Sequence, residues 1–449
     1  MKKLERGLIA PLFFIFDKYL DKPLQDNIFE RGYNMAKDES LMMDIFRSQL
    51  SKMDYNNKTE ASPDIGYPTG FLNLDYTNGY IAQQYNKETG QYSPYFNIGV
   101  ADGSFVSFIG HTSTGKSTLM VQIAANIARR FKTSQVWYDQ TELKAMNLQR
   151  IYELSRYSKD DFKKKFIVRN AGITIENVYT RINMIYKTKT DPANIDKYLY
   201  DTGYKDMYGN PIIKLEPTLY LIDSIAMIMP EDVEEDDELA SKTFAMQSAN
   251  KITTLMKQIM SKLQSANIIL MVTNHIQENI QLGYIPKQNP TPYLKPDERM
   301  PKGRTVTYSA NNIWRVDSAS KLKVDDPYHI EGAIANVSMV KSRNSGIKTA
   351  TKLVNNFSIG FDPWLSILEA LKAAKRIYGA GVSLSLDPDK EFKFSYGTYR
   401  EKLQTEPEFR KYVLKHALEY FKTIPYNPES GESDDFMDDL LSDELFSVN

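Results

Sequence analysis

The sequence predicts an α/β protein with a mainly parallel central sheet and helices on both faces. Short apolar runs alternate with segments of helical periodicity through the middle of the chain, a pattern that is typical of parallel sheets with crossover helices. One connection between a strand and a helix, residues 110–117, is rich in glycine and ends in lysine and serine. At 449 residues the chain is long enough for two or three structural units.

The expected elements follow in chain order. Apolar runs predict strands at residues 104–110, 136–138, 166–168, 218–223, 267–273, 333–341 and 349–357. Helical spacing predicts helices at residues 117–131, 364–378 and 407–421. Two long connections interrupt this order. We expect residues 188–217 to be an inserted, hairpin-like excursion, whereas residues 276–304 contain too much Pro, Gln and Gly for a packed helix. Loops of this length inside a compact domain are usually functional or disordered.

Four units are expected along the chain. Apolar residues at helical spacing indicate a helical N-terminal region, and a stretch rich in Pro and Gly separates it from the core. In order, the expected units are a helical N-terminal segment for oligomerisation (1–60), a core (61–380) with insertions at 75–93 and 188–217, a helical C-terminal subdomain (381–428) and an acidic tail (429–449).

The net charge of −1 hides a segregation of charge. From Ser430 onward the chain has seven acidic residues and neither Lys nor Arg, so residues 1–429 carry a net charge of +6. A mildly basic body with an acidic tail is common in proteins that meet nucleic acid, because the tail competes with phosphate for the basic surface. A tail that only keeps the protein soluble explains the same pattern.

Composition excludes several classes of site. The chain has no cysteine, which excludes disulfides and thiolate metal sites, and its four histidines are too scattered for a zinc centre. The apolar residues 8–16 are fewer than the roughly 20 of a membrane-spanning helix, and no signal-peptide cleavage site follows them. We expect a soluble, cytoplasmic protein that does not enter membranes, in which these residues form a packing helix or an arm that docks on a neighbour.

Residues 110–117 have the sequence G-H-T-S-T-G-K-S, with a predicted strand before them and a helix after them. Glycines allow close backbone approach, so that N–H groups at the helix N-terminus can hold phosphate groups. In such a P-loop, Lys116 reaches the β- and γ-phosphates of ATP and the Ser117 hydroxyl binds Mg²⁺. The alternative is a chance match within a turn. The expected nucleotide-binding residues are Gly110, His111, Thr112, Ser113, Thr114, Gly115, Lys116, Ser117 and Thr118.

Two carboxylates are expected beside this loop. Asp223 ends the apolar strand at residues 218–223, the position at which P-loop ATPases hold the magnesium ion and its bound water. Glu142 follows the strand at residues 136–138, where a carboxylate can orient and activate the attacking water. The alternative for Glu142 is an acid at a helix start that stabilises the first turn.

Polar residues at two further strand ends are candidates. Asn274 and His275 end the strand at residues 267–273, where a polar side chain can sense the γ-phosphate. The alternative is a loop entry without a special role. Lys341 and Arg343 end a late strand, and two cations there can stabilise transferred phosphoryl charge, including on the ATP of a neighbouring subunit. A solvated basic strand end explains these two residues equally well.

Several of these segments together resemble the UvsX proteins of T-even-like phages, which are viral relatives of the bacterial recombinase RecA. In chain order they are G-H-T-S-T-G-K-S, V-W-Y-D-Q-T-E, L-Y-L-I-D-S, V-T-N-H, T-Y-S-A-N-N-I and V-K-S-R. The stretch Gly360-Phe361-Asp362-Pro363, followed by Leu365, Leu368 and Leu371, is also similar to that family. The resemblance covers roughly residues 98–425 with gaps and implies a RecA-like P-loop ATPase core. One departure is that two residues separate Asp139 from Glu142, where the family has D-x-E.

The resemblance implies roles for the residues above. Glu142 is the catalytic carboxylate, and His275 couples the γ-phosphate to the DNA-binding loop that follows it. Lys341 and Arg343 reach across a subunit interface. In this family ATP binding assembles a helical filament on single-stranded DNA, which searches duplex DNA for homology and exchanges strands. The implied ligands of phosphate and magnesium are Lys116, Ser117 and Asp223.

Two loops are candidates for DNA contact. Residues 231–238 follow Asp223, where the family's first DNA-contacting loop lies, but seven of these eight positions are acidic and would repel phosphate. The second loop, residues 276–304, interleaves cations with tyrosines, and such loops can pair phosphates and stack bases. The alternative is a surface loop whose charges are only solvated. The candidate DNA-binding residues are Lys287, Tyr293, Lys295, Arg299, Lys302 and Arg304.

The sequence is therefore expected to encode a DNA-dependent ATPase and strand-exchange recombinase that uses ATP and Mg²⁺. It would act as a helical homo-oligomer on single-stranded DNA, with a mediator or single-strand-binding protein as a further partner. Two alternatives stay open. A ring-forming replicative helicase of the DnaB kind shares the P-loop core and a late K-x-R-N, which residues 341–344 fit, although residues 136–142 lack the helicase S-L-E-M segment. An ATP-switched regulator that is not a motor would account for the acidic residues 231–238.

Overall fold

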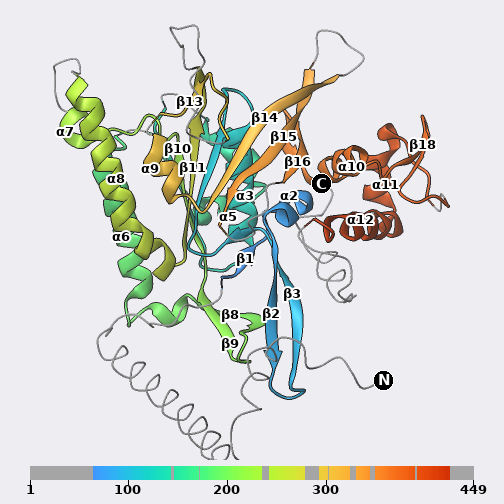
Figure 1. Ribbon diagram of the computed structural model, residues 1–449, viewed down its shortest axis with the longest axis horizontal. Helices are drawn as coiled ribbons and strands as arrows, with labels where there is room; N and C mark the ends of the chain where they lie inside the picture. Colours follow the sequence, from blue (N-terminus) through green and yellow to red (C-terminus); the bar gives the residue numbers. More distant parts are fainter. Residues whose placement is uncertain are drawn as a thin grey trace, which may run out of the picture. The chain divides into compact units, whose positions relative to one another are not determined.

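The structure is a computed structural model in which the described residues are 64–424, apart from 143–145, 171, 235–241, 279–292, 302, 324–329, 344–348 and 390–391. The expected N-terminal segment 1–60 and the acidic tail 429–449 lie outside the described residues. In Figure 1 a central sheet carries helices on its faces, and two hairpins extend from it.

Among the described residues, one large sheet is built from nine strands. They are β5 (Phe105–Gly110), β6 (Val136–Gln140), β7 (Phe166–Arg169), β10 (Thr218–Asp223), β11 (Ile268–His275), β14 (Asn312–Lys323), β15 (Ile330–Ser342), β16 (Ala350–Asn356) and β17 (Gly360–Asp362). Their order is β17-β16-β15-β14-β5-β11-β10-β6-β7. The strands from β14 to β7 all run parallel, and β15, β16 and β17 add antiparallel pairings.

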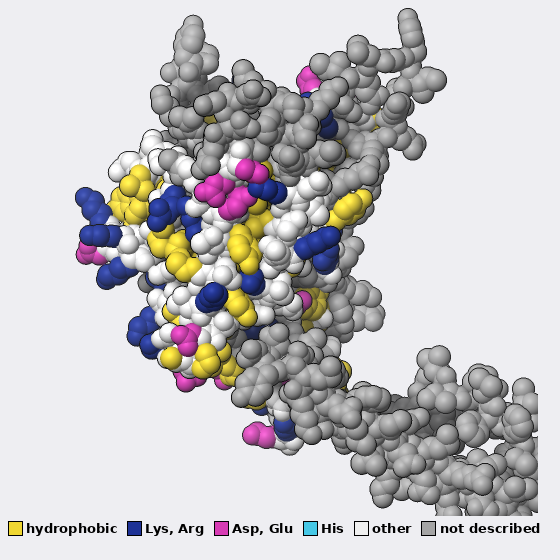
Figure 2. Space-filling model, turned by 90° about the vertical axis from the view of Figure 1, so that its left-hand side faces the viewer, with side chains coloured by type: hydrophobic (Ala, Val, Ile, Leu, Met, Phe, Trp, Pro, Cys, Tyr) yellow, Lys and Arg dark blue, Asp and Glu magenta, His cyan; other side chains and the backbone are white. Residues whose placement is uncertain are grey.

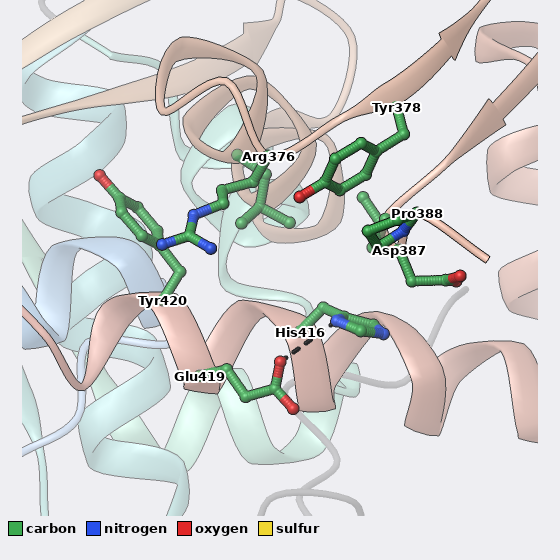
Figure 3. Close-up of a pocket in the computed structure, with 9 residues that line it drawn as sticks. Arg376, Tyr378, Asp387, Pro388, His416, Glu419 and Tyr420 are labelled. Atoms are coloured by element: carbon green, nitrogen blue, oxygen red, sulfur yellow. Dashed lines mark ion pairs between the residues drawn. The ribbon is translucent and has the colours of Figure 1, made fainter. Parts of the chain in front are cut away.

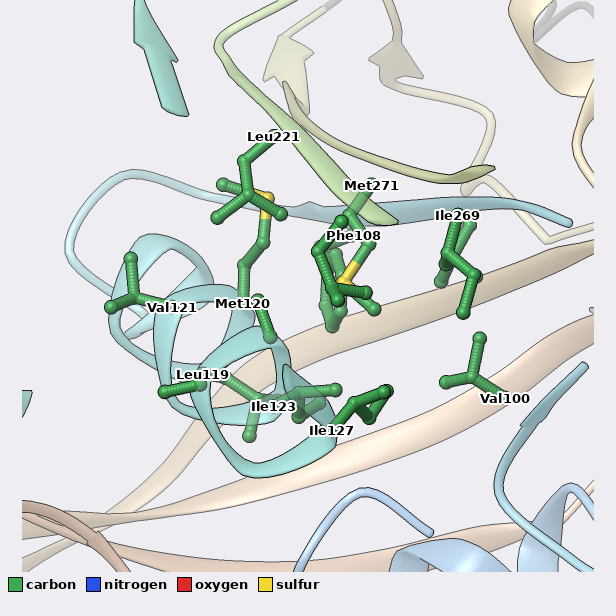
Figure 4. Packing of buried hydrophobic residues seen from close by; sticks show 14 of the residues in the cluster. Val100, Phe108, Leu119, Met120, Val121, Ile123, Ile127, Leu221, Ile269 and Met271 are labelled. Carbon is green, nitrogen blue, oxygen red and sulfur yellow. The ribbon is translucent and has the colours of Figure 1, made fainter. Parts of the chain in front are cut away.

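One face of the parallel strands packs on helix α3 (Lys116–Arg129), which follows β5 directly. Val106 and Phe108 of β5 belong to this first core together with the apolar face of α3. Figure 4 shows Met120 of α3 pointing towards Leu221 of β10, with Phe108 beside them. Because side chains alternate along a strand, the residues between these point to the opposite face.

The opposite face packs on α6 (Ile175–Thr190) and α8 (Lys242–Ser265). Phe105 and Ile109, the neighbours of the first-core residues in β5, belong to this second core. Strands that are buried on both faces consist of continuous apolar runs, which is why the sequence reveals them. The predicted α/β core, with a mostly parallel sheet and helices on both faces, is confirmed.

One long strand was not predicted. β14 lies parallel to β5 at its start and then continues with β15 as an antiparallel ribbon. Its first half is buried at Ile313, Trp314 and Val316, whereas the positions after Asp317 are mostly polar and exposed. This second half extends beyond the core, so it carries no apolar periodicity from which a strand could be predicted.

The two expected insertions form hairpins that pack against each other (Figure 1). The strands are β2 (Tyr80–Asn86) with β3 (Gln91–Asn97), and β8 (Leu199–Lys205) with β9 (Pro211–Leu215). The rings of Tyr95 and Tyr204 stack with their centroids 4.2 Å apart, and Lys87 Nζ donates to Asn210 Oδ1 at 2.7 Å. The expectation of a hairpin within residues 188–217 is therefore confirmed.

The first insertion begins later than residue 75, so the expected boundary was wrong. Helix α2 (Leu72–Thr77) is buried along its whole length. Asp75 is 2% exposed, and its Oδ1 accepts hydrogen bonds from the backbone N–H and the hydroxyl of Thr69. Tyr76 packs in a third core. Asp75 is therefore hydrogen-bonded inside the protein, and the ring of Tyr76 is buried among apolar residues.

This third core lies among the last helices, α10 (Pro363–Ala373), α11 (Tyr396–Thr405) and α12 (Pro407–Phe421). The side chain of Asp362 caps α10 by accepting hydrogen bonds from two backbone N–H groups of its first turn. The same helix supports the sheet, because Ser366 Oγ accepts a hydrogen bond from the N–H of Val354 in β16. Of these helices, α10 lies within the expected core (61–380), and α11 and α12 lie within the expected C-terminal subdomain (381–428).

Along the described part of the chain, no helix combines the length and the apolar character that crossing a bilayer requires. Figure 2 shows the face that lies on the left of Figure 1. Cationic, acidic and apolar side chains are interspersed there, and the lysines and arginines lie in several separate groups.

Candidate active site

Residues from four predicted strand ends meet at one edge of the sheet. Because β5, β6, β10 and β11 run parallel, their carboxyl ends lie side by side, which is where ligands bind in such sheets. In the register, Gly110 pairs with His275, and Asp223 pairs with Gln140. Glu142 follows β6 by two residues. The fold therefore brings the predicted P-loop, residues 110–117, together with Asp223, Glu142 and His275.

The P-loop needs glycine at both ends. Gly110 has a φ of 154°, and a Cβ there would lie 2.2 Å from the carbonyl oxygen of Val316. Gly115 has a left-handed φ of 94°, and its Cβ would lie 2.9 Å from the ring of Phe361. Any other residue at these positions would have to displace backbone or a buried ring, so the loop conformation depends on both glycines.

The loop faces solvent while the start of its helix is covered. His111, Thr112 and Ser113 are exposed, whereas Thr114, Ser117 and Thr118 are partly buried. The backbone N–H groups in the first turn of a helix have no partner within the helix, and the helix dipole favours an anion there. An anion from solvent can therefore approach the start of α3 across the exposed part of the loop.

Lys116 is buried beneath the loop. Its side chain is 5% exposed, and its Nζ donates to the carbonyl oxygen of His111 at 2.6 Å. Burial lowers the pKa of Lys116 to about 8, against the opposing charges of Asp223 and Glu142. An anion near Nζ would stabilise this poorly hydrated cation, so the position suits phosphate binding.

Asp223 is fixed by two hydroxyl groups. Its Oδ2 accepts a hydrogen bond from Tyr138 Oη at 2.7 Å, and its Oδ1 accepts one from Thr273 Oγ1. Burial, together with the charge of Asp223, raises the pKa of Tyr138 well above its ordinary value, so this hydroxyl keeps the proton that it donates. Each carboxylate oxygen has a further lone pair. Asp223 therefore has acceptor capacity left for a hydrogen bond from a metal-bound water.

Glu142 belongs to a small hydrogen-bonded cluster. Its Oε1 accepts a hydrogen bond from Ser224 Oγ at 2.9 Å and lies 2.7 Å from His275 Nε2. Thr141 holds the chain in place, because its N–H donates to the Asp223 carbonyl oxygen at 2.8 Å and its hydroxyl donates to that of Ser224 at 2.7 Å. Partial burial raises the pKa of Glu142, but the hydrogen bonds with His275 and Ser224 outweigh it and lower the pKa overall. The carboxylate is therefore ionised and able to accept a proton.

Asp139, the other acid of the same segment, does not join this cluster. It lies in β6 and is 2% exposed. Its Oδ2 accepts hydrogen bonds from Arg181 of α6 and from the hydroxyl of Tyr220 in β10. Asp139 thus forms a buried ion pair on the α6 side of the sheet, and of the two acids Glu142 is the one beside the P-loop.

Lys341 and Arg343 lie away from this site. β15 runs antiparallel to β14, so its last residues lie beside the first residues of β14, at the opposite end of the parallel strands from the P-loop. Lys341 Nζ donates to the carbonyl oxygens of Thr307 and Tyr308 at 2.8 and 3.0 Å, and Arg343 Nη2 donates to that of Tyr308 at 2.6 Å. Burial and the charge of Arg343 lower the pKa of Lys341 to about 8. Both cations cap the end of α9 (Gly303–Ser309) within one subunit.

The candidate DNA-binding residues are only partly described. Lys295 and Arg299 are exposed. Tyr293 is partly buried and packs against the second core. The acidic residues 231–238 start with the short helix α7 (Glu231–Glu234), and 235–238 lie outside the described residues. Also outside the described side chains are Lys287, Lys302 and Arg304.

Sequence reasoning missed the residues that hold the carboxylates. Tyr138, Thr273 and Ser224 are each hydrogen-bonded to Asp223 or Glu142. A signal existed for the first two, because the period of two along a strand places Tyr138 in β6 and Thr273 in β11 on the α3 side, where Asp223 also lies. Ser224 follows Asp223 directly, and no pattern in the sequence indicates its contact with Glu142.

A cavity of about 190 Å³ lies elsewhere, among α10, α12 and the hairpin of β18 (Tyr378–Ala380) with β19 (Ser383–Ser385) (Figure 3). The guanidinium of Arg376 lies 5.8 Å from the ring centroid of Tyr420, and His416 Nδ1 lies 3.2 Å from a carboxylate oxygen of Glu419. Its lining residues all come from the chain after residue 370. The cavity is therefore separate from the site at the strand ends.

A scan against protein-family models finds no match to the chain, and a search of curated proteins finds none either.

Proposed function

We propose that the protein is a RecA-like P-loop ATPase that acts as a DNA strand-exchange recombinase, working with ATP and Mg²⁺ as a helical filament on single-stranded DNA. The observation that supports this most is the meeting of the P-loop, the buried Lys116, Asp223 and Glu142 at one edge of a parallel sheet. Phosphoryl transfer to water needs such an arrangement, in which cations and a carboxylate are positioned before the substrate binds.

In this proposal, the P-loop and Lys116 bind the phosphate groups. The N–H groups at the start of α3 hold phosphate oxygens, and Lys116 exchanges the carbonyl oxygen of His111 for a phosphate oxygen. Ser117 and Asp223 would hold a magnesium ion, which neutralises the negative charge that develops on the phosphates. Because Lys116 is already desolvated, little water has to be removed when the phosphate arrives.

Activation of water falls to Glu142. Its carboxylate orients the attacking water and takes a proton at the oxygen that is not shared with Ser224 and His275. His275 pairs with Gly110 at the end of β11 and begins the connection to the candidate DNA-binding loop. Because His275 also contacts Glu142, a change in the loop can change the position of the catalytic carboxylate. This contact supports an ATPase that depends on DNA.

The position of Lys341 and Arg343 supports an oligomer. These cations cap α9 at the far end of the sheet, so in this arrangement they do not reach the P-loop of their own subunit. In a head-to-tail assembly they face the P-loop edge of a neighbour, where a cation can stabilise transferred phosphoryl charge. The resemblance to UvsX-type recombinases supports the same placement, and open head-to-tail contacts produce a helical filament.

The test is nucleotide-dependent binding to DNA. We measure the anisotropy of a labelled single-stranded oligonucleotide with and without a non-hydrolysable ATP analogue and Mg²⁺. Lys116→Ala should abolish the gain in DNA affinity that the analogue produces in the wild type. The control, Lys132→Ala, removes an exposed lysine just beyond α3 and should behave as the wild type. An undiminished gain in the Lys116→Ala variant would contradict the proposal.

A further inference from the structure

A buried ion pair joins the segment 276–304 to the sheet beside the P-loop. Glu298 of β13 (Glu298–Arg299) is 4% exposed, and Arg315 of β14 is 8% exposed. Arg315 donates to both carboxylate oxygens of Glu298, through Nη1 at 2.7 Å and through Nη2 at 2.8 Å. In the register of the sheet Arg315 lies opposite Ile109, the residue before the first glycine of the P-loop. The pair therefore lies directly beside the start of that loop.

Arg315 also holds the residues that precede Glu298. Its Nη1 also donates to the carbonyl oxygen of Tyr293 at 3.1 Å, and the N–H of Lys295 donates to Glu298 Oε2 at 2.8 Å. The hydrogen bonds from Arg315 lower the pKa of Glu298 to about 2, so the carboxylate is charged throughout the physiological range. Asp317 accepts a hydrogen bond from Arg315 Nε at 2.8 Å and fixes the guanidinium from the other side. Residues 293–298 are thus attached to one arginine of the sheet.

His111 of the P-loop lies close to the ion pair of Glu298 and Arg315. Its Nε2 lies 3.7 Å from Glu298 Oε1. Its carbonyl oxygen accepts hydrogen bonds from Lys116 Nζ at 2.6 Å and from Thr114 Oγ1 at 3.0 Å. A phosphate group draws Lys116 away from this carbonyl, because the same Nζ then binds a phosphate oxygen. His111 therefore lies between the cation that binds phosphate and the carboxylate that holds the segment.

We propose that Glu298, held by Arg315, is a positioning residue through which His111 transmits nucleotide binding at Lys116 to the described residues 293–300 of the segment 276–304. This inference rests on the proposed nucleotide site, although not on hydrolysis. The segment leaves β11 after His275 and returns through α9 to β14, and these are the two strands that flank β5. A bound nucleotide can thus affect both ends of the segment. It acts on one end through His275 and on the other through Glu298.

The test follows backbone hydrogen exchange at residues 293–300 of the full chain, with and without a non-hydrolysable ATP analogue and Mg²⁺. Exchange in the wild type should change when the analogue binds. His111→Ala should abolish this change at analogue concentrations that saturate the variant, as established by equilibrium binding in parallel. His111 is half exposed, so its replacement does not endanger the fold.

Two further variants test whether His111 couples the nucleotide to residues 293–300 or only supports the fold. His111→Gln should restore the response, because its side-chain amide nitrogen can take the place of the imidazole Nε2. Asp297→Asn removes the exposed acid next to Glu298 and should leave the response unchanged. A merely structural contact would not produce this difference between alanine and glutamine at position 111.

Three results would count against the inference. One is that the wild type binds the analogue without any change at residues 293–300. Another is that the change survives both His111→Ala and Glu298→Gln. Either result overturns the coupling and leaves the nucleotide site intact. If the wild type does not bind the analogue at all, the proposed function fails, and the inference fails with it.

Discussion

Glu142 is kept ionised by hydrogen bonds with His275 and Ser224, beside a lysine that is buried beneath the P-loop. Glu142→Gln keeps the size of this side chain but removes its ability to take a proton. We predict that ATP hydrolysis falls by about 10²-fold or more, since a positioned general base contributes about 10²- to 10⁴-fold. Nucleotide binding should persist. Phosphate release at saturating ATP and single-stranded DNA measures the first effect, and equilibrium binding measures the second.

The matched control for this substitution is Glu153→Gln, which changes a carboxylate on the solvent side of α4 (Leu148–Ser155). Its hydrolysis rate should equal that of the wild type. A Glu142→Gln protein that hydrolyses ATP at the wild-type rate would assign the base to another group.

Lys116 makes the stability of the protein depend on pH. Its pKa is about 8 in the folded protein, below the ordinary value of 10.5, because burial disfavours the charge. Between these two values the unfolded chain binds more protons than the folded protein, so the free energy of unfolding rises with pH. Lys116→Met lacks this dependence. The free energy of unfolding of the variant minus that of the wild type should therefore be most positive below pH 8 and fall by about 3 kcal/mol by pH 10.5.

Guanidinium unfolding between pH 7 and pH 10.5 measures this difference. Lys132→Met, which removes an exposed lysine, should follow the wild type across the whole range. A constant difference between Lys116→Met and the wild type would mean that the buried lysine does not titrate in this window.

At the scale of single residues, the candidate phosphate-binding and catalytic residues are easier to predict from the sequence than the residues that hold them in place. The P-loop is predictable because its glycines, lysine and serine are neighbours in the chain, and Asp223 is predictable because it ends an apolar strand. Tyr138, Thr273 and the pair of Glu298 with Arg315 were missed. Their contacts depend on how strands distant in the sequence align, and this register is set by the packing of the whole sheet.

At the scale of elements, the hairpins β2–β3 and β8–β9 stabilise each other through the stacked rings of Tyr95 and Tyr204. An aromatic pair contributes about 0.5 to 1.5 kcal/mol beyond the burial of its surface. We predict that a double-mutant cycle of Tyr95→Leu and Tyr204→Leu shows a coupling of about 1 kcal/mol in urea unfolding. Tyr92→Leu is the control, because this tyrosine is exposed and contacts Tyr85 of its own hairpin. Additive effects of Tyr95→Leu and Tyr204→Leu would show that the two stacked rings do not stabilise each other.

Some helices and strands are easier to predict from the sequence than others. β5, β10 and β11 are buried on both faces, so each appears as a mostly apolar run. β14 was missed because its outer half extends beyond the core and is mostly polar. Residues 75–93 resemble one surface insertion in the sequence because Tyr, Gln, Asn and turn residues are frequent there. The structure instead buries Asp75 and Tyr76 in α2, where Tyr76 packs in the third core.

At the scale of the whole molecule, two groups of candidate site residues lie at opposite ends of the parallel strands. A single subunit presents the P-loop, Glu142 and Asp223 at one edge of its sheet and the cations Lys341 and Arg343 at the other. If subunits stack head to tail, each nucleotide lies between one subunit's P-loop and the next subunit's cations, and the stack can continue without limit. The sequence indicated both sets of residues, but their separation within one subunit could only come from the order and direction of the strands.

The most direct measurement is electron microscopy of the protein with single-stranded DNA and a non-hydrolysable ATP analogue. We predict open helical filaments that require both ligands, are lost in Lys116→Ala, and are shortened or lost in Arg343→Ala, whose side chain is exposed in the single subunit. Closed rings would indicate a helicase instead. Particles that DNA and nucleotide leave unchanged would contradict the proposal that this protein is a filament-forming recombinase.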